Sequence, residues 1–179
     1  FNTGLNYALK NQDRYQYIWL LDNDAELVED PLTPAIDIFE KEQDIGVIGS
    51  TILSKENPEI ITEIGGNILK KKTIVGNFKG ARIENLKKKI YFVDYVASCS
   101  AFLRMNALKD VGLWDDFYFI YFDDVDFFWQ IKKKGYQVVG TTLSRVIHPD
   151  FIEKSNLRGN YYYQRNSLHF FLRKYRLKG

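Results

Sequence analysis

YIWLLDND, the stretch at residues 17–24, is an apolar run that stops on two aspartates separated by one residue. Residues 17–21 are predicted to form a buried strand, because a short apolar run bounded by turn residues is typical of one. Asp22 and Asp24 then lie at the carboxyl end of that strand, the edge at which open α/β sheets bind ligands. Mg²⁺ and Mn²⁺ take such oxygen ligands and bridge them to phosphates. The stretch therefore predicts a metal and diphosphate site; the alternative interpretation is a polar turn held by Asx hydrogen bonds.

The composition indicates one globular domain over residues 1–179, since 45% of the residues are hydrophobic and 16% are aromatic. The formal net charge of +2 is too small to indicate a nucleic-acid partner. Lysine triplets at 70–72, 87–89 and 132–134 are expected to be solvated faces, with contact to an anionic membrane surface as the alternative.

The single cysteine, Cys99, excludes an internal disulfide and fits a reducing compartment. No apolar run approaches the roughly 20 residues of a membrane helix, and no signal peptide is visible. We therefore expect a cytoplasmic protein, which could also contact the inner face of the plasma membrane peripherally. The chain begins at Phe1 and enters a helical pattern at once, so we expect that a front portion precedes it.

Strand and helix signals alternate along the chain. Asp30 followed by Pro31 is typical of a helix start, and residues 46–52 have the composition of a second buried strand. This strand–helix–strand order favours an α/β fold with a mixed, mainly parallel sheet flanked by helices. The lysine- and glycine-rich segment at about 54–90 is predicted to be a loop-rich insertion. Further elements are expected as a helix around Leu5, helices at 106–112, 123–134 and 157–175, and strands at 60–64, 73–75, 91–97, 100–105, 136–141 and 145–148.

A second acidic cluster lies between positions 115 and 126, where five aspartates are interspersed with aromatic residues. Asp123, Asp124 and Asp126 fall in the first turn of the expected helix, where they could simply complement the helix dipole. Because the aromatic run should be partly buried, these carboxyls are expected to have shifted pKa values, which suits a general base. Helical geometry turns Asp124 about 100° away from Asp123, so neighbouring acids could have different roles.

A histidine and an arginine complete the candidate residues. His148 follows a predicted strand and could ligate a metal together with Asp24, although a lone histidine near a strand end is more often structural. Arg165 lies in an aromatic segment at 160–166 and could grip a diphosphate with two hydrogen bonds. The tyrosines of that segment could pack on a membrane surface. An equally good interpretation is that they dock the C-terminal helix on the domain. His169 on the same helix is expected to be structural.

Taken in order, these motifs resemble the family 2 glycosyltransferases of the GT-A fold, and within them the bacterial rhamnosyltransferase and galactofuranosyltransferase-like branch. The long acidic and aromatic segment is the most specific part of the resemblance. The matching segments are FNTGLN (1–6), WLLDND (19–24) with the DxD motif, VASCSAFLR (96–104), VGLWDDFYFIYFDDVD (111–126), GY (135–136), VIH (146–148) and YQRN (163–166).

The resemblance implies a role for each candidate residue. Asp124 would be the catalytic base, with Asp123 beside it at a position where the family usually has glutamate. Asp24 and His148 would bind the divalent cation. The implied donor-side residues are Asp22, Asn2 and Arg165, and the implied acceptor-side residues are Trp114, Ser98 and Ser100, the two serines standing near positions where the family often has glycine.

The resemblance further implies an inverting transferase that uses Mg²⁺ or Mn²⁺. It would move a hexosyl or rhamnosyl group from a nucleoside-diphosphate sugar to a hydroxyl of a glycan or lipid-linked acceptor, in cell-surface polysaccharide synthesis. In the family a first strand and a nucleotide-base pocket come before the segment that Phe1 begins, so this chain alone is expected to bind donor poorly.

The residues leave two other functions open. One is a metal-dependent phosphohydrolase that uses the same carboxylates on water, and the other is a non-catalytic sugar- or membrane-binding module. The aromatic residues near the C-terminus could also form a homodimer or contact a membrane surface.

Overall fold

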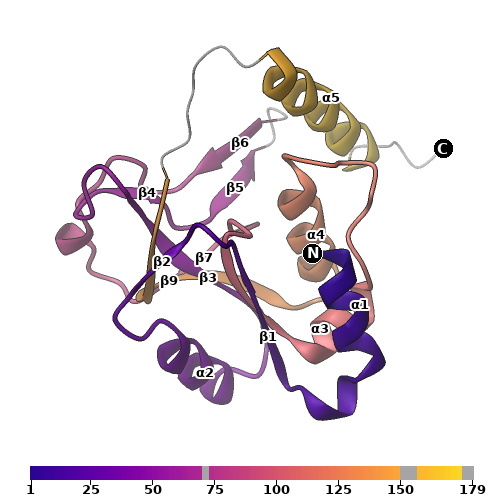
Figure 1. The fold of residues 1–179 in the computed structure, drawn as a ribbon, viewed down its shortest axis with the longest axis horizontal. Helices are drawn as coiled ribbons and strands as arrows, with labels where there is room; N and C mark the ends of the chain where they lie inside the picture. Colours follow the sequence, from indigo (N-terminus) through magenta and orange to yellow (C-terminus); the bar gives the residue numbers. More distant parts are fainter. Residues whose placement is uncertain (70–72, 150–156, 175–179) are drawn as a thin grey trace.

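The computed structural model describes residues 1–69, 73–149 and 157–174. A sheet lies between α2 on one face and the other helices on the opposite face (Figure 1). The helices are α1 (Asn2–Lys10), α2 (Leu32–Lys41), α3 (Met105–Val111), α4 (Asp123–Lys133) and α5 (Leu157–Lys174), with short 3₁₀ helices η1 (Gln12–Arg14) and η2 (Ile83–Asn85). The strands are β1 (Tyr17–Leu21), β2 (Glu26–Val28), β3 (Ile45–Ser54), β4 (Ile61–Glu63), β5 (Gly66–Leu69), β6 (Thr73–Gly76), β7 (Ile90–Phe92), β8 (Ser100–Arg104) and β9 (Gln137–His148).

In the described part of the chain, seven strands form one sheet in the order β1-β8-β3-β9-β2, with β4 paired to β3 and β7 paired to β9. β3 and β9 are parallel, whereas the other strand pairs are antiparallel. The α/β fold with a mixed, helix-flanked sheet is confirmed, but the expectation of mainly parallel pairing is corrected. β1 and β3 do run in the same direction, as a strand–helix–strand order predicts, but β8 lies between them and is antiparallel to both.

Neighbouring residues of the central strands point to opposite faces of the sheet. Val47 and Leu103 join the large core under α1, α3, α4 and α5, whereas Ile48 and Phe102 pack against α2. All four side chains are buried. Burial on both faces explains why the sequence of β3 is an almost continuous apolar run.

Several elements have the expected bounds and others differ. β1 spans Tyr17–Leu21 as expected, and Asp30 Oδ1 accepts a hydrogen bond from the N–H of Leu32 (3.0 Å) at the start of α2. β9 is one strand where two were expected, because it continues through an irregularity in its pairing with β3. The strand expected at 91–97 ends early, at Phe92.

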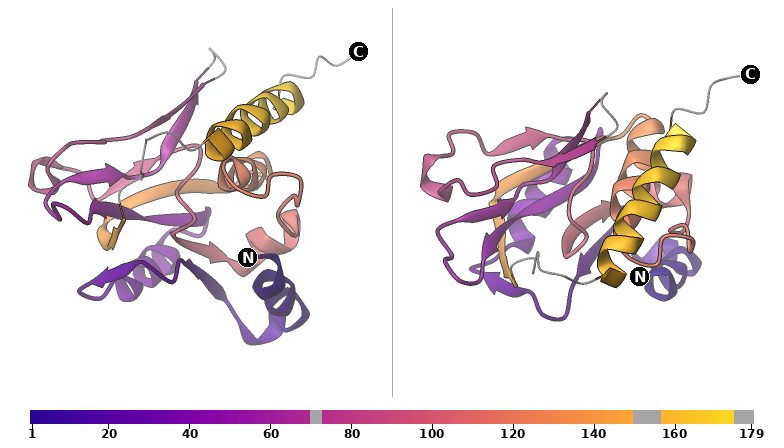
Figure 2. Two further views of the ribbon diagram at one scale, coloured as in Figure 1. Left: turned by 45° about the horizontal axis from the view of Figure 1, so that its top comes forward. Right: turned by 90° about the horizontal axis from the view of Figure 1, so that it is seen from above.

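The segment at about 54–90 contributes to the main sheet. β4 adds to β3, while β5 and β6 form a separate hairpin that lies on the same side of the sheet as α4 and α5, as Figure 2 shows. The lysines at 70–72, and position 175 at the expected end of the last helix, lie outside the described residues.

Among the described helices, none combines the length and the apolarity needed to cross a membrane.

Candidate functional site

Asp22, Asp24 and His148 lie together although they come from opposite ends of the chain. His148 Nε2 is 3.3 Å from Asp24 Oδ1 and 3.7 Å from Asp22 Oδ2. One ligand atom from each of the three residues lies within 4.8 Å of the others. The structure therefore brings together the aspartate and the histidine predicted as metal ligands, and it places Asp22 beside them.

Strand pairing explains why these residues meet. The N–H of Ala25 donates a hydrogen bond to the carbonyl of Asp22 (3.2 Å), which closes the turn that carries both aspartates. β2 follows this turn and pairs antiparallel with the end of β9, with Glu26 opposite Ile147. Because His148 is the next residue of β9, the turn and the imidazole lie side by side.

The donor set of this group fits a divalent cation. His148 Nδ1 is 3.0 Å from the carbonyl oxygen of Pro149, and an N–H donated there leaves Nε2 facing the two carboxylates. An imidazole together with carboxylates suits Mn²⁺ and similar ions. Burial raises the pKa of Asp22, and the nearby charge of Asp24 raises it further, while His148 acts in the opposite direction.

Asp123 and Asp124 form the first turn of α4, as expected, and both are half-buried. Burial raises the pKa of Asp124 well above its ordinary value, and the charges of Asp123 and Glu63 raise it further. The N–H of Val125 donates to Asp124 Oδ1 (2.7 Å) and offsets part of this rise. The proton affinity of Asp124 is therefore higher than that of an ordinary aspartate.

Cys99 connects the metal-ligand group with the acid pair. Its carbonyl accepts a hydrogen bond from the N–H of Asp22 (3.0 Å). The pKa of its buried thiol is raised by burial and then by the charges of Asp22, Glu63 and Asp124. The charge of Asp22 also contributes to a raised pKa of Asp123, for which burial is the main cause. Ser98, the residue before Cys99, interacts through its backbone with Asp124, so the metal-ligand group and the acid pair both contact the 98–99 segment.

Glu63 is a member of this acidic region that sequence reasoning missed. It ends β4 opposite Ile52 of β3, and burial raises its pKa to about 7, an effect that the charge of Lys79 partly offsets. Its carboxylate lies against β6, since a Cβ added at Gly76 would be 2.7 Å from Glu63 Oε2. The lysine- and glycine-rich sequence around Glu63 contains no signal of these contacts, which depend on the pairing of β4 with β3.

Asn2 and Trp114, predicted on the donor and acceptor sides, bind each other. Asn2 Oδ1 accepts from the N–H of Trp114 (2.9 Å), and Asn2 Nδ2 donates to the Trp114 carbonyl (3.0 Å) and to Asp116 Oδ1 (2.6 Å). The Trp114 ring is buried and packs 5.0 Å from that of Phe127. These contacts fix the loop between α3 and α4, residues 112–122, which we call the aromatic loop.

Arg165, predicted to bind the donor, is also engaged with the aromatic loop. Its Nη2 donates to the carbonyls of Phe117 (2.6 Å) and Tyr118 (3.1 Å). The neighbouring Asn166 is fully buried. Its Nδ2 donates to the carbonyls of Tyr118 (2.8 Å), Ile120 (2.7 Å) and Tyr121 (2.8 Å). Sequence reasoning named Asn166 as part of a matching segment and missed this role.

The aromatic loop has an unusual backbone. Phe119, Tyr121 and Phe122 have φ values of 63°, 64° and 65°, in the left-handed region that bulky residues rarely adopt. Each costs on the order of 1–3 kcal/mol and persists only where surrounding contacts hold it. The hydrogen bonds from α5 are such contacts, so α5 fixes the turn directly before the acid pair.

Ser98 and Ser100, predicted on the acceptor side, differ in position. Ser98 is partly exposed, and its backbone stabilises the charged form of Asp124. Ser100 is fully buried: its Oγ is 2.7 Å from Ser50 Oγ and accepts from Trp19 Nε1 (3.1 Å). This hydroxyl is enclosed between strands, and the acceptor-side role of Ser100 stays a prediction.

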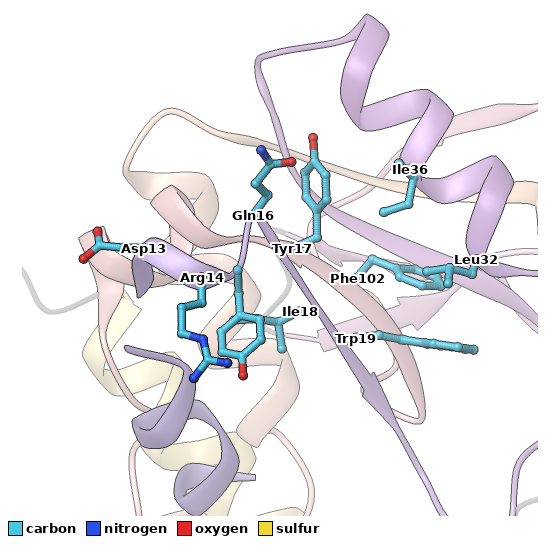
Figure 3. Close-up of a pocket in the computed structure, with 10 residues that line it drawn as sticks. Asp13, Arg14, Gln16, Tyr17, Ile18, Trp19, Leu32, Ile36 and Phe102 are labelled. Carbon is cyan, nitrogen blue, oxygen red and sulfur yellow. The ribbon is translucent and has the colours of Figure 1, made fainter. Parts of the chain in front are cut away.

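A pocket of about 470 Å³ lies along β1 (Figure 3). The pocket is lined by residues of η1, β1, α2 and β8 and of the link between η1 and β1. They are Asp13, Arg14, Tyr15, Gln16, Tyr17, Ile18, Trp19, Leu32, Ile36 and Phe102. None of the candidate site residues is among them, so the pocket has no part in the candidate site.

No protein-family model and no curated protein matches the chain. Solved structures do match it. GalNAc-T7, solved with UDP, GalNAc and Mn²⁺, aligns with a TM-score of 0.64 at 14% identity, over 95% of this chain and 34% of that chain. A197 from STIV aligns with a TM-score of 0.47 at 14% identity, over 87% of this chain and 77% of that chain. The fold is thus of the GT-A glycosyltransferase type, and this chain spans about a third of the length of GalNAc-T7.

Proposed function

We propose that this protein is a glycosyltransferase that depends on a divalent cation and moves a sugar from a nucleoside-diphosphate donor to an acceptor hydroxyl. The observation that carries the proposal is that the metal-ligand group, Asp22, Asp24 and His148, adjoins the acid pair, Asp123 and Asp124. GalNAc-T7, which has a similar fold, is solved with UDP and Mn²⁺. A diphosphate and a divalent cation are therefore ligands that this type of fold accommodates.

Asp24 and His148 would hold the cation. A cation bound there neutralises the charge that develops on the departing nucleoside diphosphate. The Asp22 side chain is 36% exposed and that of Asp24 is 58% exposed. The more enclosed Asp22 is therefore proposed to contact the ribose or the sugar of the donor as well.

Asp124 is the proposed catalytic base. It takes the proton of an acceptor hydroxyl while that oxygen attacks the anomeric carbon and the bond from this carbon to the diphosphate oxygen breaks. The products are a glycoside of inverted configuration and a nucleoside diphosphate. General-base help of this kind is typically worth about 10²–10⁴-fold in rate. Asp123, the neighbouring carboxyl, is proposed to orient the acceptor.

The order of motifs along the chain supports three more specific proposals. The protein is a family 2 glycosyltransferase, and the group that it transfers is a hexosyl or rhamnosyl group. Its acceptor is a glycan or a lipid-linked molecule in cell-surface polysaccharide synthesis, at the cytoplasmic side of the membrane. Ser98 stays the proposed acceptor-side residue because its backbone interacts with Asp124. Asn2, Trp114 and Arg165 are proposed to act through the aromatic loop that they hold.

Incubation of the protein with sugar nucleotides, Mn²⁺ and a set of acceptors, followed by mass spectrometry, tests the proposal. Glycosylated acceptor is the expected product. Donor consumption by water alone would support a phosphohydrolase instead, and sugar binding without any consumption would support a binding module. The anomeric configuration of the product, read by NMR, tests inversion separately. A retained configuration would overturn the role of Asp124 as the base of a direct displacement, but not the transfer itself.

A further inference from the structure

α5 has an exposed apolar side opposite the side that packs on the domain. Asn166, Phe170 and Phe171 are buried, and the two phenylalanines belong to the large core. On the outer side the exposed apolar residues are Leu157 (87%), Tyr161 (60%), Leu168 (63%) and Leu172 (60%), and the exposed Gln164 lies between Tyr161 and Leu168. The spacing of the apolar residues, of four, seven and four residues, places them in one stripe along the helix.

This stripe continues onto the aromatic loop. Phe117, Phe119 and Ile120 are 44%, 69% and 42% exposed. The Arg165 guanidinium lies 4.5 Å from the centre of the Phe117 ring, and the rings of Phe119 and Tyr162 are 5.1 Å apart. We call the stripe and the three exposed loop residues the outer face. Figures 1 and 2 show α5 on the outside of the fold, beyond α4. Adjoining exposed apolar side chains of this kind mark interaction sites.

The charge of α5 has one sign. The helix carries no Asp or Glu, and its basic residues are Arg158, Arg165, Arg173 and Lys174. Arg173 is paired with Asp115 (2.7 Å). Arg165 donates to backbone carbonyls, and within the described part of the chain no carboxylate forms an ion pair with it. Arg158 lies 5.9 Å from the centre of the Phe119 ring. Two cations are therefore set among the aromatic rings of the outer face.

We propose that the outer face docks the protein on an anionic lipid surface, with α5 lying in the plane of the headgroups. Leucine and aromatic side chains beside basic residues are typical of helices that lie at a membrane interface. Arginines near an anionic surface strengthen such binding by about 1 kcal/mol each.

A second copy of the chain fits the outer face less well than lipid does. A two-fold contact places the same patch of both copies together. It would bring Arg165 of one copy toward that of the other, and α5 contains no carboxylate that could pair with it. Like charges at an interface that excludes water repel strongly.

Sedimentation of the purified protein with vesicles tests this docking. We expect co-sedimentation with vesicles of phosphatidylcholine and phosphatidylglycerol in equal parts, and none with phosphatidylcholine alone. High salt should release the protein, because salt screens the attraction to the anionic surface. Leu168→Ser combined with Leu172→Ser should lower the partition coefficient by roughly tenfold or more. Arg158→Gln should lower it about fivefold.

Two substitutions elsewhere on the surface are matched controls. Leu27→Ser on β2 removes a leucine that is 51% exposed, and Arg14→Gln in η1 removes an exposed basic side chain. Both variants should partition like the wild type. Circular dichroism establishes that each variant is folded. Equal partition of the double leucine variant and the wild type, or equal binding to neutral and anionic vesicles, would overturn the proposal.

The self-association alternative has its own readout. A dimer that the double leucine substitution abolishes, found by analytical ultracentrifugation in a protein that ignores vesicles, would also overturn the proposal. The assays contain no sugar nucleotide. The result of the vesicle and ultracentrifugation assays is therefore independent of the result of the transferase assay. Either proposal can fail while the other stands.

Discussion

Asn166 and Tyr118 are joined by a hydrogen bond of 2.8 Å, from the side-chain amide on α5 to a carbonyl of the aromatic loop. The same nitrogen donates to the carbonyls of Ile120 and Tyr121. A carboxylate in this position would have no hydrogen to donate and would face three carbonyl oxygens. The amide of Asn166 therefore holds the turn that leads into the acid pair of α4.

We expect Asn166→Asp to lower the free energy of unfolding by about 3 kcal/mol, since each buried group left without its partner costs about 1–3 kcal/mol. Urea denaturation near neutral pH measures this loss. Asn160→Asp is the matched control. It makes the same amide-to-carboxylate change on the same helix, at a side chain that is exposed. Equal denaturation midpoints for the two variants would show that Asn166 does not hold the loop.

Loss of the imidazole should weaken binding of the cation. We expect His148→Ala to reduce the affinity for Mn²⁺, measured by calorimetry, by at least about tenfold, because removal of even an outer partner of a ligand costs about 10–100-fold. His169→Phe is the control: His169 stacks on Phe117 with ring centres 4.0 Å apart, and phenylalanine keeps that stacking. An unchanged affinity in His148→Ala would remove His148 from the site.

Glu63 should make the protein less stable as the pH rises. Its pKa is raised from 4.5 to about 7 in the fold, so the unfolded chain releases this proton at lower pH than the folded chain does. Between these two values folding takes up a proton, and the free energy of unfolding falls as the pH increases. The full shift corresponds to about 3 kcal/mol, and we expect about 1–3 kcal/mol because the side chain is partly exposed.

Glu63→Gln removes this dependence. Relative to the wild type, the variant should gain stability as the pH is raised through the interval between the two pKa values, and the gain should level off above it. Chemical denaturation at a series of pH values measures the difference. Glu56→Gln replaces an exposed acid of the same segment and should follow the wild type. Parallel stability curves for Glu63→Gln and the wild type would contradict the burial argument.

Gly49 on β3 leaves room for the side chain of Val96, which lies in the segment between β7 and β8. A Cβ at Gly49 would lie 2.5 Å from Val96 Cβ and 2.6 Å from Val96 Cγ1, and a β-branched side chain has no free rotation with which to move away. We expect Gly49→Ala to lower stability by about 1–3 kcal/mol in thermal unfolding. Gly4→Ala meets nothing within 4 Å on α1 and should instead raise stability by about 0.5–1 kcal/mol. A neutral Gly49→Ala would show that Val96 can shift.

The turn aspartates and the histidine could be found from sequence because local patterns identify them. The strand at Tyr17–Leu21 has the expected bounds, and Asp22 and Asp24 follow it directly. His148 likewise stands at the end of a strand. Polar residues that leave buried strands tend to gather at one edge of a sheet, so their meeting could be expected before the pairing of β2 with β9 was known.

Residues whose roles depend on distant contacts could not be assigned in this way. Asn2 has suitable chemistry for donor binding, but its amide binds Trp114, 112 positions along the chain. Ser100 likewise has a hydroxyl that is enclosed by the pairing of β8 with β1 and β3. Glu63 is the reverse case, because a segment with the composition of a loop contributes a strand to the sheet. Residue type and spacing do not contain these pairings.

The proposed base can be tested by a substitution that changes little except proton affinity. We expect Asp124→Asn to reduce the transfer rate by about 10²–10⁴-fold, because an amide cannot take the proton of the acceptor hydroxyl. In the wild type only the charged carboxylate acts as a base, so the rate should rise with pH as Asp124 loses its proton. Burial and the charges of Asp123 and Glu63 place this rise above the range of an ordinary aspartate. Asp124→Asn should show no such rise.

Binding measurements separate a chemical role of Asp124 from a structural one. Asp24 and His148 are unchanged in Asp124→Asn, so the affinity for UDP and Mn²⁺, measured by calorimetry, should equal that of the wild type. Asp37→Asn, which alters an exposed aspartate on α2, should retain both the binding and the rate. Wild-type turnover in Asp124→Asn would exclude this residue as the base. A joint loss of turnover and UDP binding would show instead that its carboxyl supports the structure of the site.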